Sequence, residues 1–422
     1  MEFLKTTNNQ NFIEHHGWYY NEVVSEKTLP IIPEPIVFLK KYDSICVEIN
    51  KHDRKIHTNY YVGTDWLNSD IAIYVEPKLN DKSAEQTDYL QMLFSALKHP
   101  GIAGYTDDLF EIKWEEKQIS ITQQQDLLTP LLVVQFLRVV QQIVRKGLKK
   151  SYYKVEQNLY SRVKGKILVG QTIKQNLLKN KPLNTYCTYD EFGVNGLENR
   201  LIKKALLFVR RYMSTLQIDT SREFTAQMFN YIMPAFENVS EEVSLNDCKH
   251  TKTNVFYKEY EEAIHLAKLI LKRFGYNITN TQQTTIQTPP FWIDMSKLFE
   301  LYVLGLMKDR FGQEVTYHVN AHYQELDYLL KSPDYKMVVD AKYKPGYKNN
   351  PIKEDMRQVS GYARLDSVYK ELEIDEDKVI DCLIIYPDME NGKESFKDID
   401  LKGIEISNWN RFYKVGVKLP KI

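Results

Sequence analysis

Residues 326–343, which read LDYLLKSPDYKMVVDAKY, indicate the fold of the C-terminal part of this chain. Both ends alternate or run apolar with β-branched and aromatic residues, and the Ser-Pro-Asp between them is typical of a turn, so the segment predicts a β-hairpin. Residues two apart in a strand share a face, so Asp340 and Lys342 project together, and the neighbouring arm brings Asp327 beside them. Hydrolysis of a phosphodiester needs hard oxygen ligands for Mg²⁺ and a cation near the attacking water. These residues supply both and predict a nuclease.

The choice of the first aspartate matters, because Pro333-Asp334 matches the literal proline-aspartate of the PD-(D/E)XK nuclease motif. Asp334 lies in the expected turn, where aspartate is common because it bonds the backbone. Asp327 lies within an apolar strand, where a carboxylate has no structural reason to be unless something pairs with it. We therefore expect Asp327 and Asp340 to bind Mg²⁺, with Mn²⁺ as the alternative metal, and Lys342 to orient or help deprotonate the attacking water. The competing interpretation is an edge-strand charge beside a surface ion pair.

The composition fits an enzyme of the reducing cytoplasm. Lys+Arg and Asp+Glu both number 56 among the 422 residues, so no net charge indicates a nucleic-acid protein. The N-terminus lacks the basic and apolar regions of an export signal, and the longest apolar stretch, 127–144, is interrupted by polar residues and predicts a buried helix rather than a membrane span. His318 and His322 are expected to be strand residues rather than metal ligands. Neither zinc spacing nor a disulfide framework is formed by the cysteines, Cys46, Cys187, Cys248 and Cys382.

The hydrophobic pattern predicts an α+β multidomain protein with zones at 1–120, 121–285 and 286–422. The first zone is expected to be β-rich, with strands at 45–49, 60–63 and 71–78 and a helix at 87–98. The second is expected to be mainly helical, with helices from Pro130 to about Gly147, at 198–216 and at 259–274. The Thr- and Gln-rich run 277–290 is the expected linker to the third, nuclease zone.

The second zone contains a strongly basic stretch, 145–181, in which Glu156 is the only acid. Tyrosines are interleaved with the lysines and arginines, so the stretch is suited to track a phosphate backbone. It is equally suited to meet an acidic protein partner, and a charge run is often only a solvated face. These three interpretations stay open at this point.

The third zone predicts the element order α-β-β-β-α-β. Asp294 or Ser296 is expected to cap a helix whose apolar face turns inward, with Glu300 at the edge of that face, where it can reach the metal site. A strand at 314–319, the hairpin, a helix at 353–369 and a strand at 379–386 follow. On the second helix, Gln358 and Tyr362 are four residues apart and share a face. Their Q-x-x-x-Y spacing resembles an accessory motif of RecB-like nucleases, in which such residues help to position the substrate and the catalytic lysine.

Several phrases along the chain resemble the McrC family, the nuclease subunit of McrBC-type, GTP-dependent restriction systems that cut DNA bearing modified cytosine. The most specific of them are D-M-S-K-L-F-E at 294–300, D-A-K-Y-K at 340–344 and the Gln358–Tyr362 spacing. Weaker ones are Y-V-G at 61–63, E-P-K at 76–78, R-K-G-L at 145–148, R-V-K-G-K at 162–166 and E-N-R-L-I at 198–202. The resemblance implies a C-terminal PD-(D/E)XK, restriction-endonuclease-like α/β domain. Leu326 stands where the family usually has proline, so the Asp327 assignment depends on the register of the hairpin.

The resemblance also implies a partner. The chain has no G-x-x-x-x-G-K-[ST] phosphate loop, since Gly165-Lys166-Ile167 lacks the upstream glycine and the following hydroxyl. GTP is then bound by a McrB-like hexameric AAA+ GTPase rather than by this chain, and the first two zones would dock on that ring and stimulate it, while the chain acts on double-stranded DNA. The alternatives are a free-standing RecB-like nuclease and a regulatory adaptor of an AAA+ GTPase.

Overall fold

In the computed structural model the chain divides into two compact units, residues 1–134 with 277–422 and residues 135–276. The structure describes residues 3–421 apart from 8–9, 16–21, 24–33, 53–54, 70, 78–86, 97–98, 100–101, 103–104, 107, 123–125, 127, 216–225, 227, 245–257, 278–284, 322–323 and 345–352. Lys78, Cys248 and His322 of the sequence analysis lie outside the described residues. The expected domain bounds near residues 120 and 285 stay a prediction.

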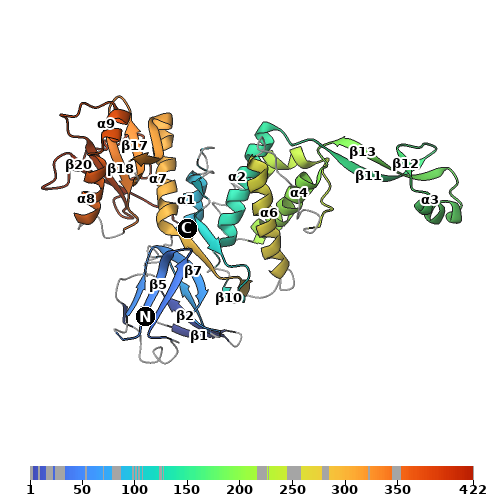
Figure 1. Ribbon diagram of the computed structural model, residues 1–422, viewed down its shortest axis with the longest axis horizontal. Coiled ribbons are helices and arrows are strands. Elements are labelled where there is room, and N and C mark those ends of the chain that lie inside the picture. The colour runs from blue at the N-terminus through green and yellow to red at the C-terminus, as the bar shows by residue number, and fades with distance from the viewer. Residues whose placement is uncertain are drawn as a thin grey trace. The chain divides into compact units, whose positions relative to one another are not determined.

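The C-terminal part of the first unit is built on a five-stranded sheet in the order β16-β17-β18-β19-β20. The first three strands are antiparallel and the last three run parallel. Figure 1 shows α7 on one side of this sheet and α8 and α9 on the other. The elements are α7 (Met295–Phe311), η7 (Gly312–Glu314), β16 (Val315–Ala321), β17 (Gln324–Lys331), β18 (Lys336–Ala341), α8 (Lys353–Tyr362), α9 (Asp366–Leu372), β19 (Asp381–Pro387) and β20 (Phe412–Val417).

This order confirms the predicted α-β-β-β-α-β succession, the cap by Asp294, whose carboxylate accepts from the N–H groups of Ser296 and Lys297, and the hairpin. The single helix expected at 353–369 was wrong, because it is divided into α8 and α9. Leu365 between them is extended, and a glycine in the last turn of α8 weakens the helix there.

The strand β19 lies between β18 and the edge strand β20, and each of its residues is buried. A near-continuous apolar run of this kind is expected of a parallel strand covered on both faces. Its one charged residue, Asp381, is paired with Arg411 at 2.6 Å and Lys402 at 2.7 Å. The pairing explains how a carboxylate is accommodated at the start of a buried strand.

The N-terminal part of the first unit holds a six-stranded sheet, β1-β2-β8-β7-β15-β9, a four-stranded sheet, β3-β6-β5-β4, and the pair β10-β14. The strands predicted at 45–49 and 60–63 are confirmed as β5 and β7. The strand predicted at 71–78 and the helix predicted at 87–98 are found over shorter ranges, as β8 and α1; residues 78, 97 and 98 lie outside the described part of the chain. The bounds are β1 (Phe3–Thr7), β2 (Gln10–His15), β3 (Glu22–Val23), β4 (Ile36–Lys41), β5 (Ser44–Asn50), β6 (Lys55–Thr58), β7 (Tyr61–Trp66), β8 (Ile71–Val75), α1 (Tyr89–Ala96), β9 (Phe110–Ile112), β10 (Ile119–Thr122), β14 (Thr285–Thr288) and β15 (Phe291–Asp294).

Strand β15 links this sheet to the C-terminal part of the unit, because it pairs with β7 and β9 and then continues directly into α7. The close approach of β7 requires glycine at position 63, since a Cβ there would lie 2.0 Å from the carbonyl oxygen of Phe291. The indole of Trp292 donates to the buried Asp65 at 3.0 Å, and Lys113 lies 2.6 Å from the same carboxylate oxygen. The start of α7 is therefore fixed by contacts of the N-terminal sheet.

The linker expected at 277–290 was wrong over part of its length, because residues 285–288 form β14. This strand pairs antiparallel with β10. Its sequence, Thr-Ile-Gln-Thr, is rich in β-branched residues, which favour strands. The preceding residues, 278–284, lie outside the described part of the chain.

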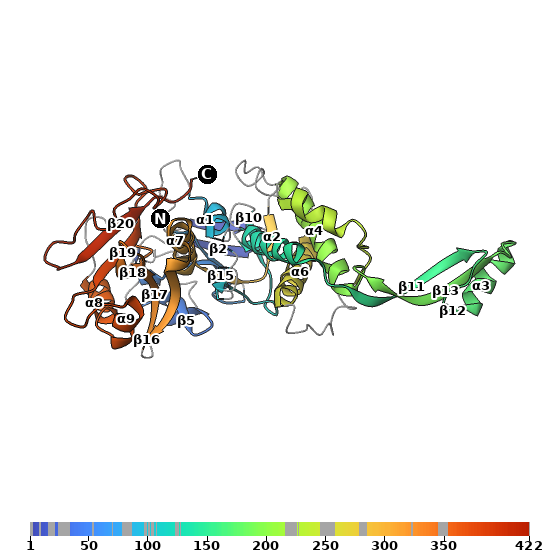
Figure 2. The ribbon, with the colours of Figure 1, turned by 90° about the horizontal axis from the view of Figure 1, so that it is seen from above.

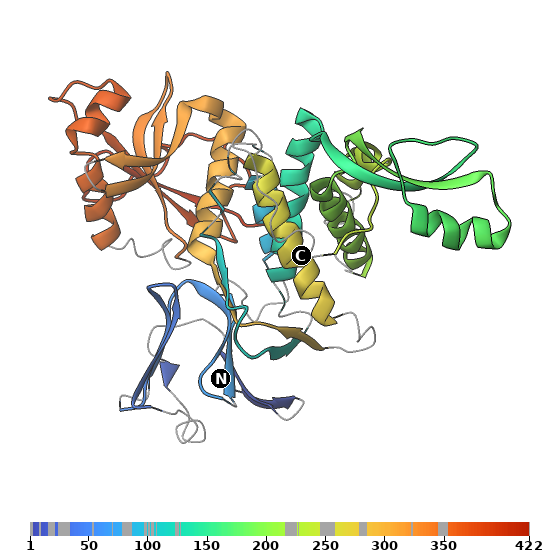
Figure 3. The ribbon, with the colours of Figure 1, turned by 45° about the vertical axis from the view of Figure 1, so that its right-hand side comes forward.

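The second unit combines helices with a long antiparallel hairpin of β11 and β13, paired from Ser151–Gly193 to Tyr160–Asn184. Figures 2 and 3 show this hairpin, with β12 and α3 near its tip, projecting beyond α4 and α6 of the same unit. The elements of the middle zone are α2 (Leu128–Lys146), β11 (Ser151–Tyr160), β12 (Lys166–Ile167), α3 (Val169–Gln175), η4 (Leu177–Lys179), β13 (Asn184–Gly193), α4 (Leu197–Thr215), η5 (Met233–Phe236) and α6 (Lys258–Asn277).

The three predicted helices of this zone are confirmed as α2, α4 and α6, but the expectation of a mainly helical zone was wrong for residues 151–193. The hairpin buries few side chains, so its strands lack the apolar alternation by which strands are usually recognised. Helix α2 is, among the described residues, the helix long and apolar enough to span a membrane. Since 78% of its most apolar window is buried, the predicted buried helix is confirmed.

Candidate active site

The candidate site lies where the strands β17 and β18 separate. Their ladder runs from Lys331–Lys336 to Tyr328–Val339, and the next pair in this register would be Asp327 opposite Asp340. In place of that ladder pair, the N–H of Ala341 donates to Oδ2 of Asp327 at 2.8 Å. The register on which the choice of Asp327 depended is therefore the predicted one. Asp334 is exposed in the turn at the other end of the hairpin.

Lys342 connects these carboxylates to α8. Its Nζ lies 2.9 Å from Oδ2 of Asp340 and donates to Oε1 of Gln358 at 3.2 Å. Nε2 of Gln358 donates in turn to the hydroxyl of Tyr362 at 2.7 Å. The contact with Asp340 is a buried ion pair, which lowers the pKa of Asp340 against the effect of burial. The structure thus brings together the hairpin trio and the two residues of the Q-x-x-x-Y spacing.

The carboxylates lie in an environment that disfavours their charge. Burial raises the pKa of Asp327 well above its usual value, and the charges of Asp340 and Glu300 raise it further. Burial also raises the pKa of Asp340 to about 6, although Lys342 opposes this. Burial alone would lower the pKa of Lys342, but the facing aspartates raise it above the usual value of a lysine. The site therefore carries more buried negative charge than Lys342 balances.

A divalent cation fits this arrangement. Mg²⁺ is commonly held by one or two carboxylates, with water and substrate phosphate completing its octahedron. Asp327 and Asp340 offer such a pair, and Lys342 does not balance the charge of both buried carboxylates. No cluster of three or more Asp, Glu, His or Cys side chains suited to a metal occurs within the described ranges. A site of this composition therefore leaves most of the coordination sphere to water and phosphate.

Glu300 lies on α7. Its Oε2 accepts a hydrogen bond from the hydroxyl of Tyr317 at 3.2 Å and lies 3.9 Å from Nζ of Lys297 and 4.0 Å from Nε2 of His318. Its charge acts on the pKa of both Asp327 and Asp340, so it belongs to the same electrostatic environment. A direct metal contact by Glu300 stays a prediction. His318 lies in strand β16, as expected.

A second connection between β18 and α8 was not predicted from the sequence. Nζ of Lys344 lies 2.8 Å from both carboxylate oxygens of Asp355, which is buried and whose charge raises the pKa of Asp340. Lys342 and Lys344 are two residues apart on an extended segment, and Asp355 and Gln358 are three apart on a helix. Matching these two spacings would have predicted the pair.

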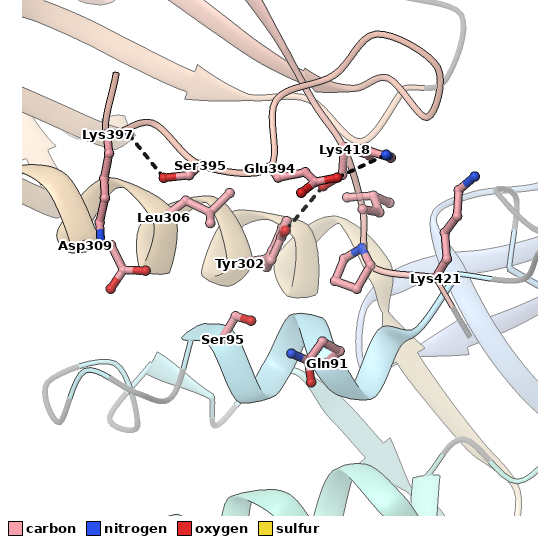
Figure 4. A pocket seen from close by; sticks show the side chains of 12 residues that line it. Gln91, Ser95, Tyr302, Leu306, Asp309, Glu394, Ser395, Lys397, Lys418 and Lys421 are labelled. Atoms are coloured by element: carbon pink, nitrogen blue, oxygen red, sulfur yellow. Dashed lines mark hydrogen bonds and ion pairs between the residues drawn. The ribbon is translucent and has the colours of Figure 1, made fainter. Parts of the chain in front are cut away.

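A pocket of about 430 Å³ lies elsewhere in the same unit, beside α1, α7 and the C-terminal segment (Figure 4). The trio and its neighbours do not line it. Tyr302 in this pocket donates to the carbonyl oxygen of Lys418 at 3.2 Å, and Lys418 is paired with Glu394 at 3.0 Å. Two of its charged groups, Lys418 and Glu394, are therefore paired with each other, and the candidate chemistry stays at the open end of the hairpin.

Comparison with models of protein families shows the family to which this chain belongs. Residues 56–387 match the model of the McrBC 5-methylcytosine restriction system component, which covers the candidate site and most of the chain. The chain belongs to the McrBC family. This confirms the family predicted from the sequence. Comparison with curated proteins gives no match to this McrBC-family chain.

Two solved structures from Thermococcus gammatolerans are similar to the McrBC-family chain. One is a half-complex from a tetradecameric assembly of McrB AAA+ hexamers with bound McrC, with 14% identity, a TM-score of 0.39, and 96% of this chain and 94% of that chain covered. The other is the McrBC complex, with 15% identity, a TM-score of 0.30, and 70% and 87% covered.

Proposed function

We propose that this McrBC-family chain is the endonuclease subunit of a GTP-dependent restriction complex and hydrolyses phosphodiesters of DNA that carries modified cytosine. The observation that supports this most directly is the meeting of Asp327, Asp340 and Lys342 at the open end of the hairpin. A PD-(D/E)XK fold for residues 286–422 belongs to the same proposal and is supported by the order of helices and strands around that hairpin.

In this proposal each residue has a separate task. Asp327 and Asp340 would hold the Mg²⁺ or Mn²⁺ ion. The bound ion would polarise the scissile phosphate and favour ionisation of the attacking water. Lys342 directs its ammonium at that water, and its orientation is fixed by Gln358, which Tyr362 bonds from the next turn of α8. Burial excludes bulk water from the carboxylates, so the effective dielectric constant is low and their charges interact more strongly than in water.

A McrB-like AAA+ hexamer is the proposed partner, and it would bind the GTP. The projecting hairpin of the second unit is the surface best suited to dock on such a partner. Many apolar side chains are exposed on this hairpin, and a contiguous exposed apolar surface is typical of a site that binds another protein. They are Tyr152, Tyr160, Val163, Ile167, Val169, Ile173, Leu177, Leu178, Leu183 and Phe192. Because the basic stretch lies on the same hairpin, its mixed apolar and basic character favours a protein partner over a DNA backbone.

The test is cleavage of a plasmid that carries 5-methylcytosine by the purified chain with its cognate GTPase, GTP and Mg²⁺. Asp327→Ala is compared with Asp334→Ala, a matched control in the exposed turn of the same hairpin. We expect cleavage by wild type and Asp334→Ala and none by Asp327→Ala. Cleavage without the GTPase would support the free-standing nuclease instead, and stimulation of the GTPase without any cleavage would support the adaptor.

A further inference from the structure

The backbone of His318 is unusual for its place in the fold. Its φ is 52°, in the left-handed region, although it lies inside the strand β16. The other described non-glycine residues with positive φ lie outside strands; they are Tyr42, Ser161, Asn180, Glu373, Asn408 and Arg411. A left-handed conformation is unfavourable for an L side chain and persists only where surrounding contacts hold it, and such residues cluster at functional sites.

The position of His318 is directly opposite Asp327. The ladder between β16 and β17 contains the pairs Tyr317–Tyr328 and Val319–Leu326, but the intervening pair is missing. In a regular strand, neighbouring side chains point to opposite faces. Here the rings of Tyr317 and His318 are stacked instead, with centroids 4.0 Å apart and planes at 32°. The left-handed backbone therefore turns the imidazole away from the ladder position opposite Asp327. The imidazole lies on the same side of the strand as Tyr317, which bonds Glu300 of α7.

The imidazole is held by groups on both of its nitrogens. Nε2 lies 2.7 Å from Nζ of Lys297, and Nδ1 lies 2.7 Å from Oε1 of Glu325. An ammonium has only donors, so Nε2 is the acceptor, and the ring hydrogen is on Nδ1, which donates to Glu325. The ring of Tyr105 packs edge-on against the imidazole at 5.7 Å. These contacts account for the persistence of the strained backbone.

The contact with Lys297 has a consequence for Glu300, which is one helical turn further along α7. The ammonium donates to His318 and stays 3.9 Å from Oε2 of Glu300, beyond hydrogen-bond distance. The hydrogen bond that Oε2 accepts comes from Tyr317 at 3.2 Å. Without the imidazole, Lys297 would donate to the Glu300 carboxylate, because a charge-assisted hydrogen bond is stronger than a contact at this distance.

We propose that His318 is a positioning residue of the nuclease site. It holds Lys297 away from Glu300 and so leaves the Glu300 carboxylate able to accept a hydrogen bond from the attacking water. This inference rests on the proposed nuclease function and adds to it a role for the strained strand residue.

The experiment compares two substitutions at position 318 with a matched control. His318→Gly keeps the backbone conformation at no strain and removes the ring, whereas His318→Asn tolerates the same conformation and retains an acceptor and a donor. Asn408→Gly is the control, because Asn408 also has positive φ, 67°, but lies in an exposed turn. Plasmid cleavage with the partner GTPase, GTP hydrolysis and the unfolding temperature are measured for each.

We expect His318→Gly to lower kcat of cleavage by roughly ten- to a hundredfold, the usual effect of removing a group that orients a site residue. The KM of His318→Gly should not change. Its stimulation of GTP hydrolysis and its unfolding temperature should not fall. His318→Asn should recover most of the rate, and Asn408→Gly should cleave as wild type does. Adding Lys297→Met to His318→Gly should restore kcat, because no ammonium is left to bond Glu300. A wild-type rate for His318→Gly, or no recovery in the double variant, would overturn the inference.

A spectroscopic readout separates this inference from the proposed function. ¹⁵N NMR of the histidine side chains, with the His318 signals assigned by their loss in His318→Asn, should show hydrogen on Nδ1 of His318. In Lys297→Met the Nε2 signal should shift, because its donor is removed. If the wild-type complex cleaves no DNA, the proposed function fails. The NMR measurement still shows whether Lys297 donates to Nε2 of His318. Hydrogen on Nε2 in the wild-type protein would overturn the inference.

Discussion

Asp340→Asn is expected to make the metal-free protein more stable while it abolishes cleavage. The side chain is 1% exposed, and its ion pair with Lys342 offsets only part of the effect of burial on its pKa. Asparagine has a similar shape and no charge, so it removes the cost of burying a carboxylate. A residue whose loss improves stability and removes activity is one retained for chemistry rather than for folding.

The magnitude follows from the pKa of Asp340, which burial raises from 3.8 to about 6. A tenfold change in proton affinity is about 1.4 kcal/mol, so the ionised side chain destabilises the folded protein by about 3 kcal/mol at neutral pH. Since the folded pKa lies above the unfolded one, the neutral carboxyl is favoured in the folded protein. The stability that the neutral Asp340 carboxyl contributes is fully present below the unfolded pKa and is lost as the pH rises through about 6.

The assay is thermal unfolding of wild type and Asp340→Asn in EDTA between pH 4 and pH 8. The variant should be as stable as wild type near pH 4. As the pH rises, wild type should lose stability relative to the variant, and the difference should be constant above about pH 7. For a unit of this size, about 3 kcal/mol corresponds to roughly 6–12 °C in unfolding temperature. Mg²⁺ should raise the unfolding temperature of wild type alone, because only wild type keeps both carboxylates.

Asp381→Asn is the matched control. Asp381 is also a buried aspartate of the same sheet, but its hydrogen bonds to Arg411 and Lys402 outweigh burial and hold its pKa below the usual value. It contributes stability above its unfolded pKa, and this is lost as the pH falls, so its asparagine variant should be less stable at pH 7. Our reasoning is refuted if Asp340→Asn is less stable than wild type at pH 8, or if the difference between them does not depend on pH.

Three further predictions follow from the site and the hairpin. Cleavage should vanish in EDTA and return with Mg²⁺ or Mn²⁺, since carboxylates with a lysine favour these ions over zinc; recovery with Zn²⁺ alone, measured on the same plasmid, would count against the site. Asp327→Ala and Lys342→Ala should each reduce cleavage nearly as much as the triple variant with Asp340→Ala, because residues that act as a unit are not additive; full activity in either single variant, measured by plasmid nicking, would remove that residue from the trio. Replacing the exposed Leu177 and Leu178 by Asp should abolish stimulation of the partner's GTP hydrolysis without changing the unfolding temperature, because neither side chain is buried; unchanged stimulation would show that the hairpin does not dock.

The hairpin trio was predictable from sequence because each part of the pattern is local. Strand alternation and turn chemistry fix the hairpin, and register then places Asp327 opposite Asp340. The spacing of Gln358 and Tyr362 predicted a shared helix face, and their 2.7 Å hydrogen bond confirms it. The helices α2, α4 and α6 were found for the same reason, since their apolar residues recur at helical spacing.

What the sequence did not reveal depends on contacts between distant segments or on backbone conformation. The strand β14 was taken for part of a linker, because its partner β10 is more than a hundred residues away. The hairpin of β11 and β13 was missed because its strands are largely exposed and carry no apolar alternation. His318 was read as an ordinary strand residue, and its left-handed φ has no signature in a single sequence.

The central claim is that this chain is the nuclease of a complex whose GTPase is a separate partner. The most direct test measures cleavage of 5-methylcytosine DNA and GTP hydrolysis in one reaction with the cognate GTPase, using wild type and Lys342→Ala. We predict that Lys342→Ala stimulates GTP hydrolysis as wild type does and cuts no DNA, because the Lys342 ammonium contacts the site residues Asp340 and Gln358. DNA cleavage by Lys342→Ala at the wild-type rate would contradict the account.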